Sequence, residues 1–242
     1  MTEVFGAVAD LFDEVRPGYP AELPAAIRAY HGGVPDEVVE VGAGTGKGTE
    51  ALLRLGAHVT CVEPDRKMAA VLRSRFPQVH VESTRFEDWV PPAGGIPLIA
   101  SAMSWHWLDE HTRNQRAHAA LSPGGTLAVF ANKYAYADPA LGRALDEAYR
   151  LVDPTLRERP DRWHHDDIAR SGLFADLEFT VLSRHEEVPA ERYLRLVQTF
   201  GPYRRAAAAD RARALATAAA VLDRAGGRVV MDVRTTLVLA RR

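Results

Sequence analysis

The sequence predicts an α/β fold with a doubly wound sheet, and three observations support this. The β-branched run Val38–Val41 leads directly into a glycine cluster, Gly42–Gly48, as a buried strand does when it ends in a tight turn. Apolar runs and helical patterns then alternate along much of the chain, which is the order expected of a sheet covered by helices. A long apolar stretch after Gly226-Gly227 predicts a terminal strand.

The individual elements are predicted from the period of the apolar residues and from Gly and Pro punctuation. Strands are expected at residues 37–41, 58–62, 79–82, 96–101, 126–131, 177–182 and 229–240. Helices are expected at residues 21–30, 46–55, 65–76, 110–121, 139–152, 189–200 and 204–225, after a shorter helical pattern between residues 4 and 20. The Pro and two Gly of residues 122–125 predict a tight turn before the fifth strand.

The length of the chain favours one domain. With 242 residues it is long enough to bury a sizeable core and lies in the range of a single α/β domain with insertions. We expect one domain over residues 1–242 with four parts. These are an N-terminal arm and helix (1–33), a ligand-binding core (34–135), a region that includes a helical cap over the substrate (136–225), and the terminal strand (226–242).

Charge and composition exclude several classes of partner. Thirty basic and thirty-two acidic residues give a formal charge of -2, so no global field attracts nucleic acid or an anionic membrane. The single cysteine, Cys61, lies in an apolar run and builds no disulfide framework. No signal peptide or membrane-span pattern is present, so we expect a cytoplasmic protein, a monomer or homodimer, that acts on a small molecule.

The glycine cluster could cradle a phosphate in two known ways, and the residues fit neither well. A phosphate-binding Walker loop needs four residues between its first glycine and Gly-Lys, and then Ser or Thr. Only three residues separate Gly42 from Gly46, and Gly48 stands where the hydroxyl should be. The dinucleotide pattern Gly-x-Gly-x-x-Gly asks for a glycine where Lys47 stands. What fits is an acid, any residue, then Gly-x-Gly-x-Gly, over Glu40–Gly46.

This pattern resembles the first motif of the class I S-adenosylmethionine-dependent methyltransferases. Residues 121–127, Leu-Ser-Pro-Gly-Gly-Thr-Leu, resemble the turn before the fifth strand of these enzymes. Residues 101–107 resemble the Ser-Ala-x-x-x-His-Trp segment of the trans-aconitate methyltransferase-like, or methyltransferase type 11, group. The resemblance implies a Rossmann-like, seven-stranded sheet of order 3-2-1-4-5-7-6 with strand 7 antiparallel. It also implies S-adenosyl-L-methionine as cofactor, S-adenosyl-L-homocysteine as product, and membership of the EC 2.1.1 class.

Cofactor contacts are expected at the ends of the first, second and fourth strands and in the arm. Glu63 follows a strand about twenty residues after the glycine loop, where a carboxylate accepts hydrogen bonds from ribose hydroxyls. Phe86 and Glu87 occupy the position where related enzymes contact adenine, and Arg16 suits a carboxylate. The expected cofactor-binding residues are Arg16, Glu40, Gly42, Ala43, Gly44, Gly46, Glu63, Pro64, Phe86, Glu87, Ser101 and Ala102.

His106 is the expected catalytic base for an acceptor that must lose a proton, because imidazole titrates near neutral pH. The alternative is that His106 only orients the wall formed by Trp105 and Trp107, and a carboxylate acceptor would need no base. The expected substrate residues are Tyr19, Trp105, Trp163, Thr199 and Tyr203, although aromatic residues at such spacings often belong to the core. No metal site is expected, because adjacent side chains in residues 164–167 diverge.

The sequence therefore predicts a methyltransferase that moves a methyl group from S-adenosylmethionine to an oxygen, including a carboxylate oxygen, or a nitrogen of a small molecule. The transfer is an in-line displacement that needs positioning more than acid–base chemistry. Two alternatives stay open. One is an NAD(P)-dependent oxidoreductase, which would share the glycine loop and Glu63. The other is a cofactor-binding module without activity, because the aspartate usual at the start of the fourth strand is absent from residues 96–99, Ile-Pro-Leu-Ile.

Overall fold

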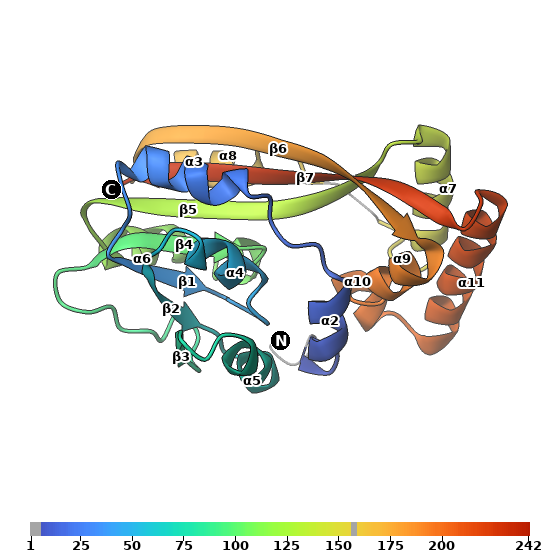
Figure 1. Cartoon of the computed structure of the whole chain (residues 1–242), viewed down its shortest axis with the longest axis horizontal. Coiled ribbons are helices and arrows are strands. Elements are labelled where there is room, and N and C mark those ends of the chain that lie inside the picture. The colour runs from blue at the N-terminus through green and yellow to red at the C-terminus, as the bar shows by residue number, and fades with distance from the viewer. Residues whose placement is uncertain (1–5, 156–158) are drawn as a thin grey trace. The chain divides into compact units, whose positions relative to one another are not determined.

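The structure is a computed structural model that describes residues 6–155 and 159–242 (Figure 1). Its contacts divide the chain into two compact units, which are described separately. The first, here called the helical unit, comprises residues 1–16, 133–159 and 183–234. The second, here called the glycine-loop unit, comprises residues 17–132, 160–182 and 235–242. The expectation of a single domain over residues 1–242 stays a prediction.

One seven-stranded sheet has the order β3-β2-β1-β4-β5-β7-β6, which confirms the predicted order (Figure 1). Strands β1 to β5 pair in parallel, with Val39 opposite Thr60 on one side and Ile99 on the other. Strand β7 runs antiparallel to β5. The N–H of Ala137 donates to the carbonyl of Val230, and the N–H of Arg242 donates to the carbonyl of Gly125, so later residues of β7 lie beside earlier residues of β5. The strands are β1 (Glu37–Val41), β2 (His58–Val62), β3 (His80–Glu82), β4 (Ile96–Ala102), β5 (Leu121–Tyr136), β6 (Ala175–Pro189) and β7 (Arg228–Arg241).

Two strands are much longer than predicted, and one predicted helix end is wrong. Strand β6 runs over Ala175–Pro189. The prediction was too short because β6 is an edge strand, and its many exposed or half-buried polar side chains interrupt the apolar run by which a strand is recognised. Strand β5 begins before its Pro-Gly-Gly turn and continues to Tyr136. The helix predicted at residues 204–225 starts only at Ala208, because Ala206 and Ala207 are extended. No Gly or Pro marks that break.

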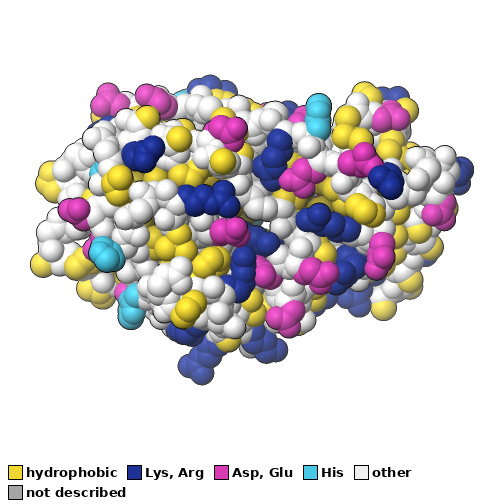
Figure 2. Space-filling model, viewed as in Figure 1, with side chains coloured by type: hydrophobic (Ala, Val, Ile, Leu, Met, Phe, Trp, Pro, Cys, Tyr) yellow, Lys and Arg dark blue, Asp and Glu magenta, His cyan; other side chains and the backbone are white. Residues whose placement is uncertain are grey.

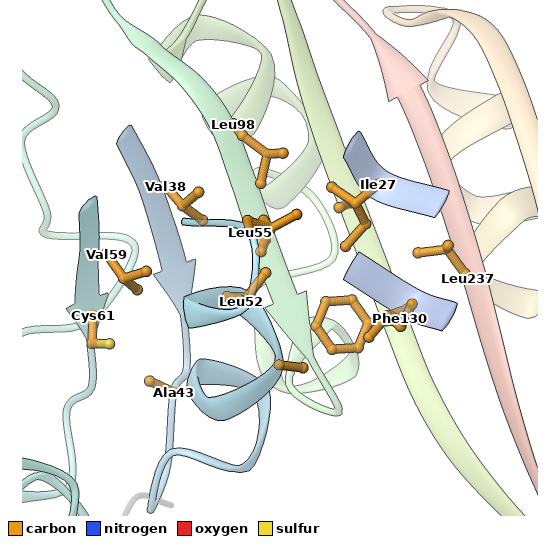
Figure 3. Packing of buried hydrophobic residues seen from close by; sticks show 14 of the residues in the cluster. Ile27, Val38, Ala43, Leu52, Leu55, Val59, Cys61, Leu98, Phe130 and Leu237 are labelled. Carbon is orange, nitrogen blue, oxygen red and sulfur yellow. The ribbon is translucent and has the colours of Figure 1, made fainter. Parts of the chain in front are cut away.

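In the glycine-loop unit, helices cover both faces of the sheet. Val38 packs in one cluster with Ile27 and Leu52, whereas its neighbour Val39 packs in another with Trp105 and Ile168. Successive strand residues point to opposite faces, so the two clusters are the two helix–sheet layers. Figure 3 shows the first layer. Its helices are α3 (Glu22–His31), α4 (Lys47–Leu53) and α5 (Arg66–Arg75); the second layer holds α6 (Arg113–Ala120), α8 (Trp163–Ser171) and the 3-10 turn η1 (Trp105–Trp107).

Among the described residues of the helical unit, five helices share a separate core with the adjoining parts of β5, β6 and β7. Two side-chain contacts fasten the segment 14–16 to the segment 195–199, between Glu14 and Arg195 and between Arg16 and Thr199. The helices are α2 (Ala9–Val15), α7 (Pro139–Tyr149), α9 (Ala190–Val197), α10 (Gly201–Arg205) and α11 (Ala208–Arg224).

On the face drawn in Figure 2, Lys and Arg side chains are interspersed with Asp and Glu, as the near-neutral net charge suggests. Within residues 6–155 and 159–242, no helix combines the length and the apolarity that crossing a membrane requires.

Buried Asn132 fastens the arm to strand β5 in the glycine-loop unit. Its amide nitrogen donates to the carbonyl oxygens of Pro17 at 3.3 Å and Gly18 at 3.0 Å, and its oxygen accepts from the Thr235 hydroxyl at 2.6 Å. The ring of Tyr19 then packs edge-on against Phe130, with 4.7 Å between the ring centroids. Asn132 therefore fixes where the arm enters this unit.

We predict that Asn132→Ala lowers the free energy of unfolding by about 1–3 kcal/mol, because the substitution leaves buried partners without their hydrogen bonds. Urea unfolding followed by circular dichroism measures this. Thr180→Ala, at an exposed position of β6, is the control and should change stability by less than about 0.5 kcal/mol. An Asn132→Ala variant as stable as this control would contradict the anchoring role.

Candidate active site

The loop between β1 and α4 adopts a backbone that requires glycine. Gly42, Gly44 and Gly46 have φ angles of 68°, 58° and 94°, in the left-handed region that glycine enters without strain. A Cβ atom at Gly46 would lie 2.6 Å from carbon atoms of Leu72 and Phe76. The sequence pattern Gly-x-Gly-x-Gly therefore has both a conformational and a packing cause.

Hydrogen bonds within the protein occupy much of the backbone of this loop. The N–H groups of Gly42 and Ala43 donate to the carbonyl of Val62 at 2.8 and 3.4 Å, and that of Gly46 donates to Ala43 at 3.0 Å. The N–H of Gly44 donates to a carboxylate, as described next. A phosphate cradle directs such N–H groups at its ligand. Their use inside the protein disfavours a phosphate site, in agreement with the failed sequence patterns.

Glu63 lies directly after β2, and backbone groups hold its carboxylate on both sides. Oε2 accepts from the N–H of Gly44 and Oε1 from the N–H of Asp65, each at 2.8 Å. Burial raises the pKa of this carboxyl, although the two backbone hydrogen bonds oppose the rise. Each carboxylate oxygen can accept a second hydrogen bond. The side chain is thus fixed in place and can still accept from two hydroxyl groups, while Pro64 follows it in the chain.

Glu40, at the start of the glycine motif, is completely buried. Its Oε2 accepts from the Thr49 hydroxyl at 2.5 Å, while Oε1 has no hydrogen-bond partner among the described residues and lies against the backbone of Gly48. Burial raises the pKa of Glu40 to about 8, the Thr49 hydroxyl opposes the rise, and the nearby Glu63 adds to it. The sequence did not predict Thr49 and Gly48 as site residues. The dense spacing of glycines before Thr49 was the one sequence feature that could have indicated them.

A turn after β4 closes against the glycine loop. The hydroxyl of Ser104 donates to the carbonyl of Val41 at 2.5 Å and lies 2.6 Å from the hydroxyl of Ser101. A Cβ atom at Gly42 would lie 2.5 Å from the Cβ of Ser104. Met103 has a left-handed φ of 57°, a strained conformation for a side chain of this kind, and its N–H donates to Phe130. The sequence pattern predicted Ser101 here but not Met103 or Ser104.

His106 lies on η1, directly after this turn, and is partly exposed. The side chain of its neighbour Trp107 is also exposed, and the two ring centroids lie 5.1 Å apart. Because β4 pairs in parallel with β1, the turn bearing His106 and the glycine loop follow the same ends of adjacent strands. The turn that bears His106 therefore lies at the same edge of the sheet as the glycine loop, and the expected role of His106 stays a prediction.

Two predicted ligand contacts belong instead to the core. Trp105 is fully buried, and its indole N–H donates to Asp167 at 3.0 Å. Phe86 is 3% exposed and stacks on Trp89, with centroids 6.2 Å apart, while its carbonyl accepts from Arg116. Both rings fill the layer between the sheet and its helices. The structure therefore gives no support to Trp105 as a substrate wall or to stacking of Phe86 on adenine.

Three other predicted residues of the glycine-loop unit are partly exposed. Glu87 accepts from the N–H of Asp109 at 3.0 Å and pairs with Arg85 at 3.3 Å. Partial burial alone would raise the pKa of Glu87, but the hydrogen bonds and Arg85 lower it overall. Tyr19 packs on Phe130, and Trp163 is half-buried with the Arg113 guanidinium 5.2 Å from its ring centroid. Their expected ligand contacts stay predictions.

Arg16, Thr199 and Tyr203 belong to the helical unit. Arg16 donates to the hydroxyl and the carbonyl of Thr199 at 2.9 and 3.1 Å, and its guanidinium lies over Phe12 and Phe200. Thr199 is fully buried, and its hydroxyl donates its hydrogen to the carbonyl of Leu196. Tyr203 is buried as well. Arg16, Thr199 and Tyr203 therefore have structural roles within the helical unit. Their predicted contacts with ligands stay predictions.

No three His, Cys, Asp or Glu side chains of the described residues gather as metal ligands would. In the segment 164–167, Asp167 pairs with Arg113 instead.

Comparison with known proteins decides which family the site belongs to. The methyltransferase domain family matches residues 38–125, the segment that contains β1 to β4, the glycine loop, Glu63 and His106. Residues 38–125 are therefore a methyltransferase domain of the class I S-adenosylmethionine-dependent type. It is 32% identical over 137 residues to an uncharacterized methyltransferase of Mycobacterium tuberculosis, covering 54% of this chain and 53% of that protein. It is 38% identical over 93 residues to trans-aconitate 2-methyltransferase of Rhizobium meliloti, covering 37% and 36%.

The chain thus matches only about half the length, or less, of these relatives. Solved structures extend the likeness to the whole fold. A protein of Anaeromyxobacter dehalogenans assigned as a type II methyltransferase has a TM-score of 0.68 at 20% identity, covering 93% of this chain and 97% of that one. Phosphoethanolamine N-methyltransferase 2 of Haemonchus contortus, solved with S-adenosylhomocysteine, has 0.57 at 14%, covering 100% and 58%. The [4+2]-cyclase SpnF has 0.58 at 14%, covering 100% and 94%.

At these identities the structural likeness shows the fold alone, and one of the similar folds is a cyclase. What the methyltransferase domain does in this protein must therefore be argued from its own side chains.

We predict that Glu40→Gln flattens the pH dependence of stability between about pH 5 and 8. The folded-state pKa of about 8 lies above that of an unfolded glutamate, so the native state binds more protons in this interval. The free energy of unfolding therefore falls as the pH rises, by up to about 1.4 kcal/mol per pH unit from this group. Urea unfolding at four pH values measures the slope. Glu178→Gln, at an exposed site, should keep the wild-type slope, and an unchanged slope in Glu40→Gln would refute the assignment.

A second substitution tests the packing under the glycine loop. Gly48 has an ordinary helical backbone, where alanine normally stabilises by about 1 kcal/mol. Here a Cβ atom would press on the Glu40 carboxylate and on Ala102, so we predict that Gly48→Ala destabilises by about 1–3 kcal/mol. Thermal unfolding compares it with Gly18→Ala, where no atom lies within 4 Å of the new Cβ. A Gly48→Ala variant more stable than the wild type would show that this packing is absent.

Proposed function

We propose that this protein transfers the methyl group of S-adenosylmethionine to an oxygen or nitrogen of a small molecule. The observation that carries the proposal is the Glu63 carboxylate, which the N–H groups of Gly44 and Asp65 hold beside the glycine loop. A carboxylate at the end of the second strand suits the paired hydroxyls of an adenosyl ribose. The matching domain family and relatives solved with S-adenosylhomocysteine support the same cofactor.

The charges of the site favour this cofactor over a dinucleotide. Two buried carboxylates, Glu40 and Glu63, stand at the glycine loop, and both have raised pKa values because burial disfavours their charged forms. A ligand with a sulfonium and an ammonium group would favour the charged forms of both carboxyl groups, whereas the negative charge of a pyrophosphate would disfavour them. The loop N–H groups that a pyrophosphate needs are already bonded within the protein.

In this proposal Gly42–Gly46 and Glu63 hold the cofactor and Glu40 lies beneath the loop. The bound sulfonium supplies an already activated methyl group. The protein then has to orient the acceptor and exclude water, which are contributions of position rather than of strong acid–base chemistry.

His106 is the proposed base where the acceptor carries a proton, because it is partly exposed on η1, which follows the turn that closes against the glycine loop. A carboxylate acceptor would use His106 only as an orienting group. Small carboxylic acids are the first acceptors to test, since trans-aconitate 2-methyltransferases are among the similar proteins. The near-neutral net charge fits a small-molecule acceptor as well.

We predict that Glu63→Gln weakens binding of S-adenosylhomocysteine by about 10- to 100-fold, the effect of losing a hydrogen bond to a charged group. The new amide nitrogen would also face the N–H of either Gly44 or Asp65, which repels it. Isothermal titration calorimetry measures the dissociation constant. Glu178→Gln, an exposed carboxylate of the same unit, is the control and should bind as the wild type does.

The same titration separates the open alternatives. Binding of NAD in place of S-adenosylhomocysteine by the wild type would overturn the proposal in favour of an oxidoreductase. Release of S-adenosylhomocysteine from S-adenosylmethionine in the presence of a panel of acids, phenols and amines tests the transfer itself. Tight cofactor binding with no transfer to any of them would favour the inactive binding module.

A further inference from the structure

Asp167 is the centre of a buried polar cluster that the proposed chemistry does not use. Its Oδ2 accepts from the indole N–H of Trp105 and from Arg113 Nε, each at 3.0 Å, and from Asn114 at 3.2 Å. Its Oδ1 accepts from Arg113 Nη2 at 2.5 Å. One carboxylate on α8 therefore joins α6 and the 3-10 turn η1, which bears His106.

Burying the charged side chains of this cluster costs desolvation free energy, so the cluster contributes more through the arrangement of its groups than through stability. The side chains of Arg113 and Asp167 are 4% and 13% exposed, and Trp105 and Asn114 are buried. Apolar residues of similar volume often stabilise a fold as well as a buried ion pair does. The Arg113–Asp167 pair fixes the orientation of α6 relative to α8, because the guanidinium group donates to both carboxylate oxygens. Partial burial would raise the pKa of Asp167, but its bonds with Arg113 and Trp105 lower it, so the carboxylate stays charged.

The turn that bears His106 is pinned by the residues on its N-terminal side. Ser104 is bonded to Val41 at the glycine loop, and Trp105 is held through its indole by Asp167 and through its carbonyl by Arg113 at 3.3 Å. Both Ser104 and Trp105 are buried, whereas His106 and Trp107 are at least partly exposed. The backbone position of His106 therefore depends on two anchors, one of which is on α8.

We propose that Asp167 is a positioning residue of the active site, which fixes through Trp105 and Arg113 the turn that carries His106. This role rests on the proposed function, in which His106 meets the acceptor. It assigns α8 a part in the site although none of its residues needs to touch the cofactor.

The test compares Asp167→Asn with Asp166→Asn in the full chain saturated with S-adenosylhomocysteine. Asp166 is the matched control, because it is the adjacent carboxylate on α8 and its side chain is 52% exposed. The ring resonances of His106, assigned with His106→Gln, are followed by heteronuclear NMR. We expect Asp167→Asn to shift or split them, with a dissociation constant for S-adenosylhomocysteine within about twofold of wild type, and Asp166→Asn to leave them unchanged.

Arg113→Lys gives a second route if Asp167→Asn does not fold. It keeps a positive charge beside Asp167 but removes the fork and the bond to the Trp105 carbonyl, so the same change at His106 is expected. His106 resonances that coincide with the wild type in every folded variant of the pair would overturn the positioning role. A wild-type chain that fails to bind S-adenosylhomocysteine would refute the proposed function instead, and the ligand-free spectra would still decide the role of Asp167.

Discussion

The close approach of the β1–α4 loop to the end of β4 is the constraint on which the site depends. Parallel pairing of β1 with β4 brings the two strand ends together, and the Ser104 hydroxyl closes the junction on the Val41 carbonyl. The fit leaves no room for a Cβ atom at Gly42. A larger residue at that position would separate the two segments, so the glycine pattern maintains this junction as much as the loop conformation.

The same junction explains why polar groups are buried at the site. Glu40 lies under the loop with one oxygen bonded to Thr49 and the other against Gly48, and Glu63 is held by backbone N–H groups of the loop and of the chain after β2. Burying a carboxylate costs free energy unless its charge is compensated. A fold that keeps two of them at one loop retains an electrostatic preference for a cationic ligand.

The sequence predicted the parts of the site whose causes are local. The glycine turn at Gly42, Gly44 and Gly46 and the place of Glu63 at a strand end were predicted because backbone conformation and strand ends are marked by residue type; their contacts with a cofactor stay predictions. The burial of Phe86 and Trp105 in the core was not predicted, because an aromatic side chain near a motif has the same sequence pattern whether it contacts a ligand or the core. Ser104 and Asp167 were missed because their partners lie 63 and 62 residues away in the chain.

The order of the strands was predicted more accurately than the ends of the strands and helices, because those ends depend on contacts that the local sequence does not show. The buried strand β1 is recognised by its three valines, which face both sides of the sheet, whereas the edge strand β6 contains charged residues and has no apolar run over most of its length. The N-terminal helix is held by side chains about 180 residues distant, Thr199 and Arg195, which no local pattern records. Motifs thus predict the residues proposed to hold the cofactor, whereas the turn that bears His106 is fixed by polar contacts between residues far apart in the chain. Such contacts leave no local pattern in the sequence, which is why the sequence predicts less about the acceptor than about the cofactor.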